Sequence, residues 1–138
     1  MNRDNIIISR LDFQRINRCI VEAKDQRSIN EFEIQRLIYE LSRAKIVDPR
    51  EIPDNLITMN SEVEISFSGN NQTLKLKIVY PEEADFKNGK ISIFSPIANA
   101  LLGHKLGDSI EWIVPAGGTS FTVDKILYQP EASGHYNI

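Results

Sequence analysis

Apolar residues in the first third of the chain recur at intervals of three and four positions. This spacing places them on one face of a helix, and it occurs twice. The two sets are Phe13, Ile16, Ile20 and Ala23, followed by Ile34, Leu37, Leu41 and Ala44. The polar stretch 24–29 between them predicts a short turn. We therefore expect two amphipathic helices that pack antiparallel as a hairpin, with arms of about 22 Å.

Polar residues mark the expected start of each helix. Ser9, followed three positions later by Asp12, resembles a capping box with Asp in place of the usual Glu or Gln. Asn30 and Glu33 repeat this spacing ahead of the second apolar set. Both pairs therefore predict helix N-termini.

A proline ends the helical part of the chain. Asp48 precedes Pro49, and a residue before proline is displaced from the α region. The second helix is therefore expected to end here, ahead of an extended linker. The predicted division is a coiled-coil hairpin over 1–47, a linker over 48–55 and a C-terminal domain over 56–138 with a polar, aperiodic tail.

Beyond the linker the hydrophobic pattern has a period of two. Apolar and polar side chains alternate at 63–67 and again at 74–80, as in half-buried strands. Pro96 begins a short predicted helix over 97–102, which Gly103 closes. Three further strands are expected at 91–94, 109–114 and 120–128. The predicted fold class is α+β, with an antiparallel sheet and one helix following the helical hairpin.

Composition and charge narrow the class of protein. The chain has 138 residues, of which 41% are hydrophobic and 25% charged, as in a soluble globular protein with one core. Sixteen basic and nineteen acidic residues give a net charge of −3, which argues against sequence-specific DNA or RNA binding. No apolar run is long enough for a membrane span or a signal peptide, so we expect a cytoplasmic protein.

Two segments of the C-terminal domain are specific enough to suggest a family. They are 78–85 (IVYPEEAD) and 89–103 (GKISIFSPIANALLG). With the Gly107-Asp108 turn, they resemble the C-terminal domain of the bacterial Gre transcript-cleavage factors, over about residues 56–128. The resemblance implies an FKBP-like fold and binding to RNA polymerase at the rim of its secondary channel.

The same resemblance suggests where the polymerase is bound. In Gre factors the contact involves the segment around a Ser-Pro pair, which corresponds to Phe94, Ser95 and Pro96 here. Phe94 departs from the acidic or polar residue that often precedes the pair. These three residues are the expected partner-binding site, and RNA polymerase is the expected partner.

The expected hairpin tip differs from that of a cleavage factor. Gre factors use acidic residues at the tip of a long hairpin to help hold a catalytic Mg²⁺, because a hard cation prefers oxygen ligands. Here Lys24 and Arg27 flank Asp25, so the charges nearly cancel. Asp25 and Arg27 mark a tip that is poorly suited to metal binding.

These features favour a non-enzymatic transcription regulator that competes with Gre-type factors for RNA polymerase. Residues 58–61 and 128–132 are similar to a branch of the family with a shorter hairpin, which implies an indirect effect on nucleoside diphosphate kinase. One alternative is a factor that stimulates transcript cleavage. Another is a small-molecule or peptide-binding module on the same fold.

The single cysteine and the two histidines are not spaced for catalysis or metal binding. Cys19 is the single cysteine, which excludes an intramolecular disulfide, and no base is evident beside it. His104 and His135 have no partner at metal-ligand spacing. We therefore expect no catalytic residue, cofactor or metal in this chain.

Overall fold

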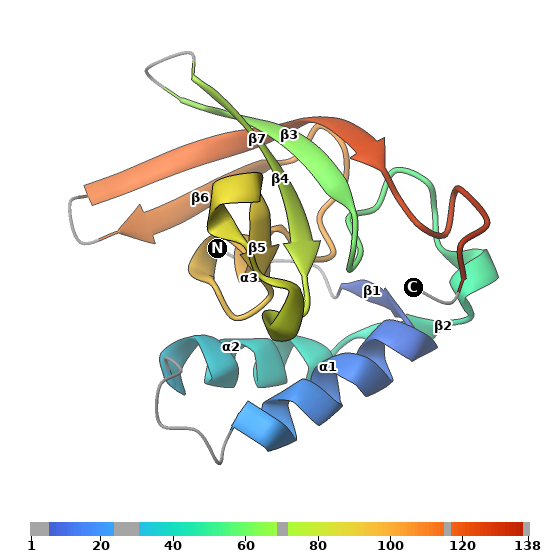
Figure 1. Ribbon diagram of the computed structural model, residues 1–138. Coiled ribbons are helices and arrows are strands. Elements are labelled where there is room, and N and C mark those ends of the chain that lie inside the picture. The colour runs from blue at the N-terminus through green and yellow to red at the C-terminus, as the bar shows by residue number, and fades with distance from the viewer. Residues whose placement is uncertain (1–5, 24–30, 69–71, 115–116, 137–138) are drawn as a thin grey trace.

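The computed structural model describes residues 6–23, 31–68, 72–114 and 117–136 (Figure 1). Side chains are described over these ranges except at 31–33 and 112–119. The expected helix cap at Asn30 and the hairpin tip with Asp25 and Arg27 lie outside the described residues.

Two helices form the lower layer of the molecule in Figure 1 and run in roughly opposite directions. They are α1 (Arg10–Ala23) and α2 (Glu31–Ser42). Their buried side chains match the predicted apolar faces: Ile16, Ile20 and Ala23 on α1, and Ile34, Leu37 and Leu41 on α2. The spacing of apolar residues thus correctly predicted which side of each helix is buried. Within the described residues, no helix is long and apolar enough to cross a membrane.

The second helix ends earlier than the proline signal predicted. After Ser42 the chain becomes extended and forms β2 (Lys45–Val47), which pairs in parallel with β1 (Ile7–Ser9). Ile and Val at these positions favour extended backbone, and neither strand is long enough to show a period of two. Asp48 instead accepts a hydrogen bond from the Arg50 nitrogen at 3.0 Å, ahead of the short helix η1 (Pro49–Glu51).

The upper layer is a five-stranded sheet with the strand order β5-β4-β3-β7-β6. Its strands are β3 (Glu62–Phe67), β4 (Thr73–Val79), β5 (Lys90–Ser92), β6 (Ser109–Val114) and β7 (Gly117–Tyr128). All five strands lie close to their predicted positions. The sheet is mixed, however, and the prediction of an antiparallel sheet was wrong for β5, which pairs in parallel with β4.

The parallel pairing follows from the connection between β4 and β5. Two short helices, η2 (Pro81–Glu83) and η3 (Phe86–Asn88), carry the chain back along β4 before β5 begins. The pairs Lys77↔Lys90 and Val79↔Ser92 show that both strands then run the same way. A tight hairpin turn could not produce this arrangement, because parallel neighbours need a crossover.

The sheet curls over α3 (Pro96–Leu101), which supplies buried side chains to the core (Figure 1). Ala98 and Leu101 pack in the same hydrophobic cluster as Ile65 and Phe121 of the sheet. The buried residues of α1 and α2 belong to this cluster too. The structure is therefore α+β with a shared apolar interior, while the division into separate parts 1–47 and 56–138 stays a prediction.

The polar tail begins inside the folded structure: Gln129 and Glu131 are buried, whereas residues 132–136 are exposed. The Gln129 side chain is 3% exposed, and its Nε2 donates to the carbonyls of Pro53 and Leu56 at 2.7 and 2.6 Å. Its Oε1 accepts from the Ala132 nitrogen at 3.0 Å. Gln129 thus supplies the donor for the buried Leu56 carbonyl and adds a second donor to the Pro53 carbonyl, which also accepts from the Leu56 nitrogen at 3.3 Å.

Replacing this side chain should destabilise the fold. We expect Gln129→Ala to lower the free energy of unfolding by about 1–3 kcal/mol, because it leaves the buried Leu56 carbonyl without its donor. Urea denaturation followed by circular dichroism measures the change. Gln35→Ala, at an exposed position of α2, is the matched control and should change stability by less than about 0.5 kcal/mol. Equal losses in both variants would contradict the anchoring role of Gln129.

Candidate functional site

The connection between β5 and α3 is a tight corner formed by residues 92–96, here called the β5–α3 corner. The Ser92 carbonyl accepts from both the nitrogen and the hydroxyl of Ser95, at 2.9 and 2.8 Å. The Ser92 hydroxyl accepts from the Phe94 nitrogen at 3.1 Å. Two serines three positions apart therefore hold the backbone of the corner in one conformation.

Ser95 also caps the helix that follows. Its backbone is extended, its Oγ accepts from the Ala98 nitrogen at 3.4 Å, and Pro96 occupies the first turn. Proline suits this position because the first helical nitrogens have no intrahelical partner. A Ser-Pro pair is thus a local signal for the start of α3, independent of any binding role.

The three predicted contact residues differ in accessibility. Phe94 is 8% exposed and lies in the hydrophobic cluster, so its side chain belongs to the core. Ser95 is half-buried and hydrogen-bonded as described above, whereas Pro96 is exposed. Pro96 is therefore the member of the set whose side chain a partner can reach without a change in the fold.

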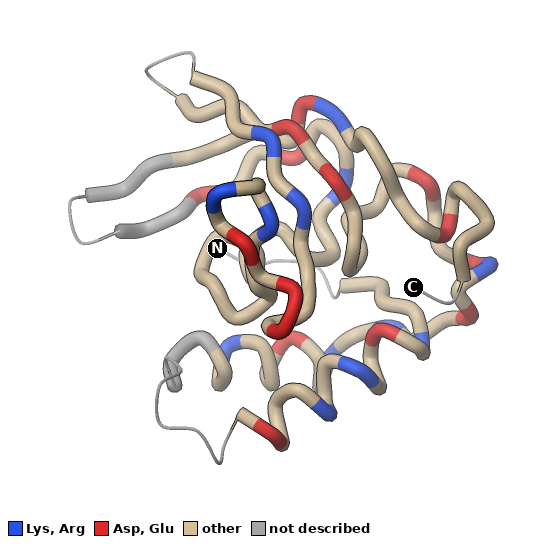
Figure 2. The backbone as a smooth tube through the Cα atoms, in the orientation of Figure 1, with Lys and Arg blue, Asp and Glu red and all other residues tan. Residues whose placement is uncertain are grey.

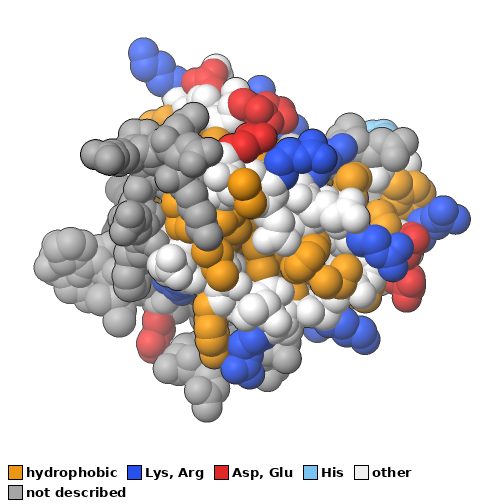
Figure 3. Space-filling view, turned by 90° about the horizontal axis from the view of Figure 1, so that it is seen from below, with side chains coloured by type: hydrophobic (Ala, Val, Ile, Leu, Met, Phe, Trp, Pro, Cys, Tyr) orange, Lys and Arg blue, Asp and Glu red, His pale blue; other side chains and the backbone are white. Residues whose placement is uncertain are grey.

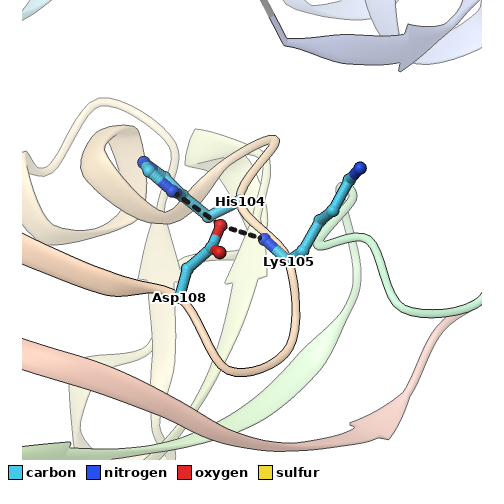
Figure 4. A network of polar contacts seen from close by, with 3 residues as sticks. All are labelled: His104, Lys105 and Asp108. Carbon is cyan, nitrogen blue, oxygen red and sulfur yellow. Dashed lines mark hydrogen bonds and ion pairs between the residues drawn. The ribbon is translucent and has the colours of Figure 1, made fainter. Parts of the chain in front are cut away.

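A second polar network fixes the loop after α3 (Figure 4). The Asp108 Oδ2 accepts from the Lys105 nitrogen at 2.8 Å and lies 3.2 Å from Nδ1 of His104. The His104 carbonyl accepts from the Ile57 nitrogen at 2.8 Å. This histidine, for which the sequence showed no partner, thus helps to close the turn that holds α3 in place.

The most deeply buried charged side chain lies where α1 meets the upper layer. Asp12 is 1% exposed, and its Oδ1 and Oδ2 accept from the Tyr80 hydroxyl at 3.2 Å and from the Met59 nitrogen at 3.3 Å. Nearby, the Thr58 hydroxyl donates to the Glu131 carboxylate at 2.8 Å. We call these five residues the Asp12 joint, since they connect α1, the start of the C-terminal domain and the tail.

The Asp12 joint corrects the capping-box prediction. The Ser9 hydroxyl does accept from the Asp12 nitrogen at 3.1 Å, as the spacing predicted. The Asp12 carboxylate, however, bonds to Met59 and Tyr80 and not to the start of its own helix. Sequence reasoning missed this because both partners are more than forty positions away.

The electrostatics of the joint bring the pKa of its buried carboxyl group close to neutrality. Burial, and then the charge of Glu131, raise the pKa of Asp12 from 3.8 to about 7, against the opposing effects of Met59, Tyr80 and Arg15. Burial likewise raises the pKa of Glu131. Burial and the neighbouring Asp12 raise the pKa of Tyr80, so its hydroxyl keeps its proton and acts as a donor.

The remaining candidates have little reactive chemistry. Cys19 is half-buried, and burial followed by Glu82 and Glu22 raises the pKa of its thiol, which lowers its reactivity as a nucleophile. Within the part of the chain that the structure describes, no three His, Cys, Asp or Glu side chains are grouped so that they could hold a metal.

Seen from the side of the helical layer, the surface shows hydrophobic side chains among basic ones (Figure 3). The helical layer exposes several large hydrophobic residues, which include Val21 on α1, Tyr39 on α2 and Ile46 on β2. Arg43 donates to the Tyr39 hydroxyl at 3.0 Å and lies over its ring.

The fold and the Ser-Pro corner can be compared with known proteins. Residues 52–128 match the family model described as transcription elongation factor, GreA/GreB, C-terminal. The matched range contains the whole β5–α3 corner and the turn closed by Asp108. The chain belongs to the GreA/GreB family.

Individual members of the GreA/GreB family agree with this assignment. The regulator of nucleoside diphosphate kinase of Escherichia coli K12 is 36% identical over 137 residues, which cover 99% of this chain and 98% of that protein. GreA of Beijerinckia indica is 37% identical over 107 residues, covering 78% of this chain and 68% of that protein. A solved GreA/GreB factor from Nitrosomonas europaea superposes with a TM-score of 0.75 at 37% identity, covering 89% and 99% of the two chains.

The raised pKa of Asp12 predicts that the stability of the fold depends on pH. Unfolded Asp12 ionises near pH 4, whereas the folded protein keeps this proton until about pH 7. Wild-type stability should therefore fall as pH rises between these values. We expect the free energy of unfolding of Asp12→Asn to rise relative to that of the wild type by up to about 1.4 kcal/mol per pH unit from pH 5 to 7. Above pH 8 the difference should stay constant.

Denaturant unfolding at each pH measures this difference. Asp54→Asn, at an exposed linker position, provides a control and should keep a constant offset from the wild type. Parallel pH profiles for Asp12→Asn and the wild type would show that Asp12 is ionised throughout the range and would contradict the assignment.

Proposed function

We propose that this protein is a transcription regulator that binds RNA polymerase near its secondary channel and catalyses no reaction itself. The observation that carries this proposal is the β5–α3 corner, which lies inside the range that matches the GreA/GreB C-terminal model. The corner presents an exposed proline on a backbone that its serines hold rigid. A rigid contact loses little conformational entropy on binding, which favours recognition by a large partner.

The length of the helical layer supports a regulator over a cleavage factor. Helices of 14 and 12 residues reach about 21 and 18 Å at 1.5 Å per residue. The match to GreA of Beijerinckia indica covers only 68% of that longer protein. Helices this short favour obstruction of the polymerase channel. They do not favour the delivery of carboxylates to the polymerase metal, which a cleavage factor requires.

The name of the Escherichia coli relative suggests a further consequence. That protein is called a regulator of nucleoside diphosphate kinase. We propose that any influence of the present chain on such an enzyme is indirect and results from altered transcription. Competition with Gre-type factors would follow from a shared binding site on the polymerase.

A charge placed at the β5–α3 corner tests the proposed contact. Pro96→Glu should weaken binding to purified RNA polymerase at least tenfold, because a partner would have to desolvate the new carboxylate. An acidic residue in the first turn of α3 is compatible with helix formation, so folding should be preserved. Biolayer interferometry measures the affinity, and circular dichroism checks the fold.

Pro49→Glu provides the matched control. Pro49 begins η1 directly after a capping side chain, just as Pro96 begins α3 after Ser95. The control should bind as the wild type does. If both variants retain wild-type affinity, the β5–α3 corner is not the docking site.

A transcript-cleavage assay separates the proposed function from its alternative. With backtracked complexes, we expect no cleavage above background from this protein alone, because its tip has nearly balanced charges. Increasing amounts should then inhibit cleavage stimulated by a Gre factor. Strong cleavage that is lost in Asp25→Ala would instead establish a cleavage-stimulating factor.

A further inference from the structure

An aromatic side chain stands almost free of the fold in the connection that precedes β5. Phe86 is 85% exposed, compared with 66% for Val21 and 58% for Tyr39, the next most exposed large hydrophobic residues among those described. It begins η3, which lies in the connection between β4 and β5. A phenylalanine ring in this position contributes nothing to the core and leaves a large apolar surface in water.

The turn that carries Phe86 is rigid. Asp85 and Lys90 exchange backbone hydrogen bonds at 2.9 and 3.0 Å, and the Asn88 side chain donates to the Asp85 carboxylate at 2.6 Å. The nitrogen of Gly89 donates to the Phe86 carbonyl at 3.1 Å. Residues 85–89, here called the Phe86 turn, therefore display the ring on a fixed backbone.

Gly89 further fixes the backbone of the Phe86 turn. Its φ is +74°, a left-handed conformation that favours glycine, and its carbonyl accepts from the Lys77 nitrogen at 2.8 Å. A Cβ at this position would lie 3.2 Å from the Lys75 carbonyl oxygen. The turn is thus fastened against β4, and ordering it on binding would cost little entropy.

Charges on either side of the ring define the partner's chemistry. Glu82 and Glu83 of η2 are exposed on one side along the chain, and Lys87 and Lys90 follow on the other. Figure 2 shows the acidic segment nearer the helical layer and the basic residues farther from it. A complementary site would be an apolar pocket with basic side chains facing η2 and acidic ones facing η3 and β5.

The Phe86 turn and the β5–α3 corner lie at the two ends of one short strand. β5 has three residues, which span about 10 Å, and it is an edge strand of the sheet. Edge strands leave one row of backbone groups available to a partner. The two turns are therefore connected directly along this edge strand.

We propose that the Phe86 turn is a second contact with RNA polymerase, in which the Phe86 ring fills an apolar pocket between oppositely charged side chains. The inference rests on the proposed function, because the same polymerase is the partner. Aromatic residues that enter pockets dominate the energetics of many interfaces. The flanking charges would orient the protein so that Pro96 meets its own contact.

The test compares two exposed apolar positions in the full chain. Phe86→Ala should weaken binding to purified RNA polymerase at least tenfold while leaving the circular dichroism spectrum and melting temperature unchanged. Leu127→Ala is the control, since Leu127 is 45% exposed on β7, which β4 and β3 separate from β5. The control should bind within twofold of the wild type.

Reversing one of the flanking charges tests whether these charges orient the protein on the polymerase. Glu83→Lys should weaken binding, and the loss should diminish as salt concentration rises, because screening reduces the repulsion. Glu111→Lys, at an exposed position of β6, makes the same exchange on the far edge of the sheet and should bind as the wild type does.

The outcomes distinguish this inference from the proposed function. If the wild type does not bind RNA polymerase, both are overturned. If Pro96→Glu weakens binding but Phe86→Ala retains wild-type affinity, the second contact alone is overturned. The alternative is that the Phe86 turn binds a second copy of this chain, which sedimentation without polymerase detects. A dimer that Phe86→Ala dissociates would assign the turn to self-association and overturn the proposal.

Discussion

The buried carboxyl group of Asp12 is the constraint on which the arrangement of the two layers depends. An ionisable group with 1% exposure requires hydrogen-bond partners, because desolvating it without them is costly. Those partners are the Met59 nitrogen and the Tyr80 hydroxyl, one at the start of the C-terminal domain and one at the end of β4. Satisfying the carboxyl group therefore fixes where α1 lies against the sheet. Hydrophobic contact alone would allow the helices to slide, since apolar burial is non-directional.

Tyr80 connects this joint to the proposed docking surface. It is the residue between β4 and η2, so the Phe86 turn and the β5–α3 corner follow it directly along the chain. The hydrogen bond to Asp12 thus holds α1 at a set position relative to both exposed turns. Under the proposed function, in which the sheet layer binds the polymerase and the helical layer obstructs its channel, the two layers need this fixed relation. The raised pKa of Asp12, to about 7, gives that relation a dependence on pH near neutrality.

Features set by local sequence could be predicted, and features set by distant partners could not. The apolar faces of α1 and α2, the alternation in β3 and β4, and the Pro96 start of α3 each arise within a short window, and the structure bears them out. The pairing of β1 with β2 and the parallel register of β5 depend on where the chain returns, which no periodicity encodes. The buried positions of Gln129 and Glu131 could not be predicted, because their partners, Leu56 and Thr58, lie more than seventy positions away. Family resemblance located the Ser-Pro corner, but only the structure distinguishes the buried Phe94 from the exposed Pro96.

The two phenylalanines at the ends of β5 illustrate how the fold separates stability from recognition. Phe94 lies in the core, so its replacement would disturb packing and binding together and could not distinguish them. Backbone hydrogen bonds hold the turn that carries Phe86 and do not involve its ring, so the exposed ring does not contribute to the stability of the fold. Exposing such a ring carries a cost in aggregation risk, because apolar surface promotes non-specific association. The acidic and lysine residues on either side reduce that cost by keeping the surface charged, and they also restrict which pocket the ring can enter. The same local arrangement therefore protects the free protein and selects its partner.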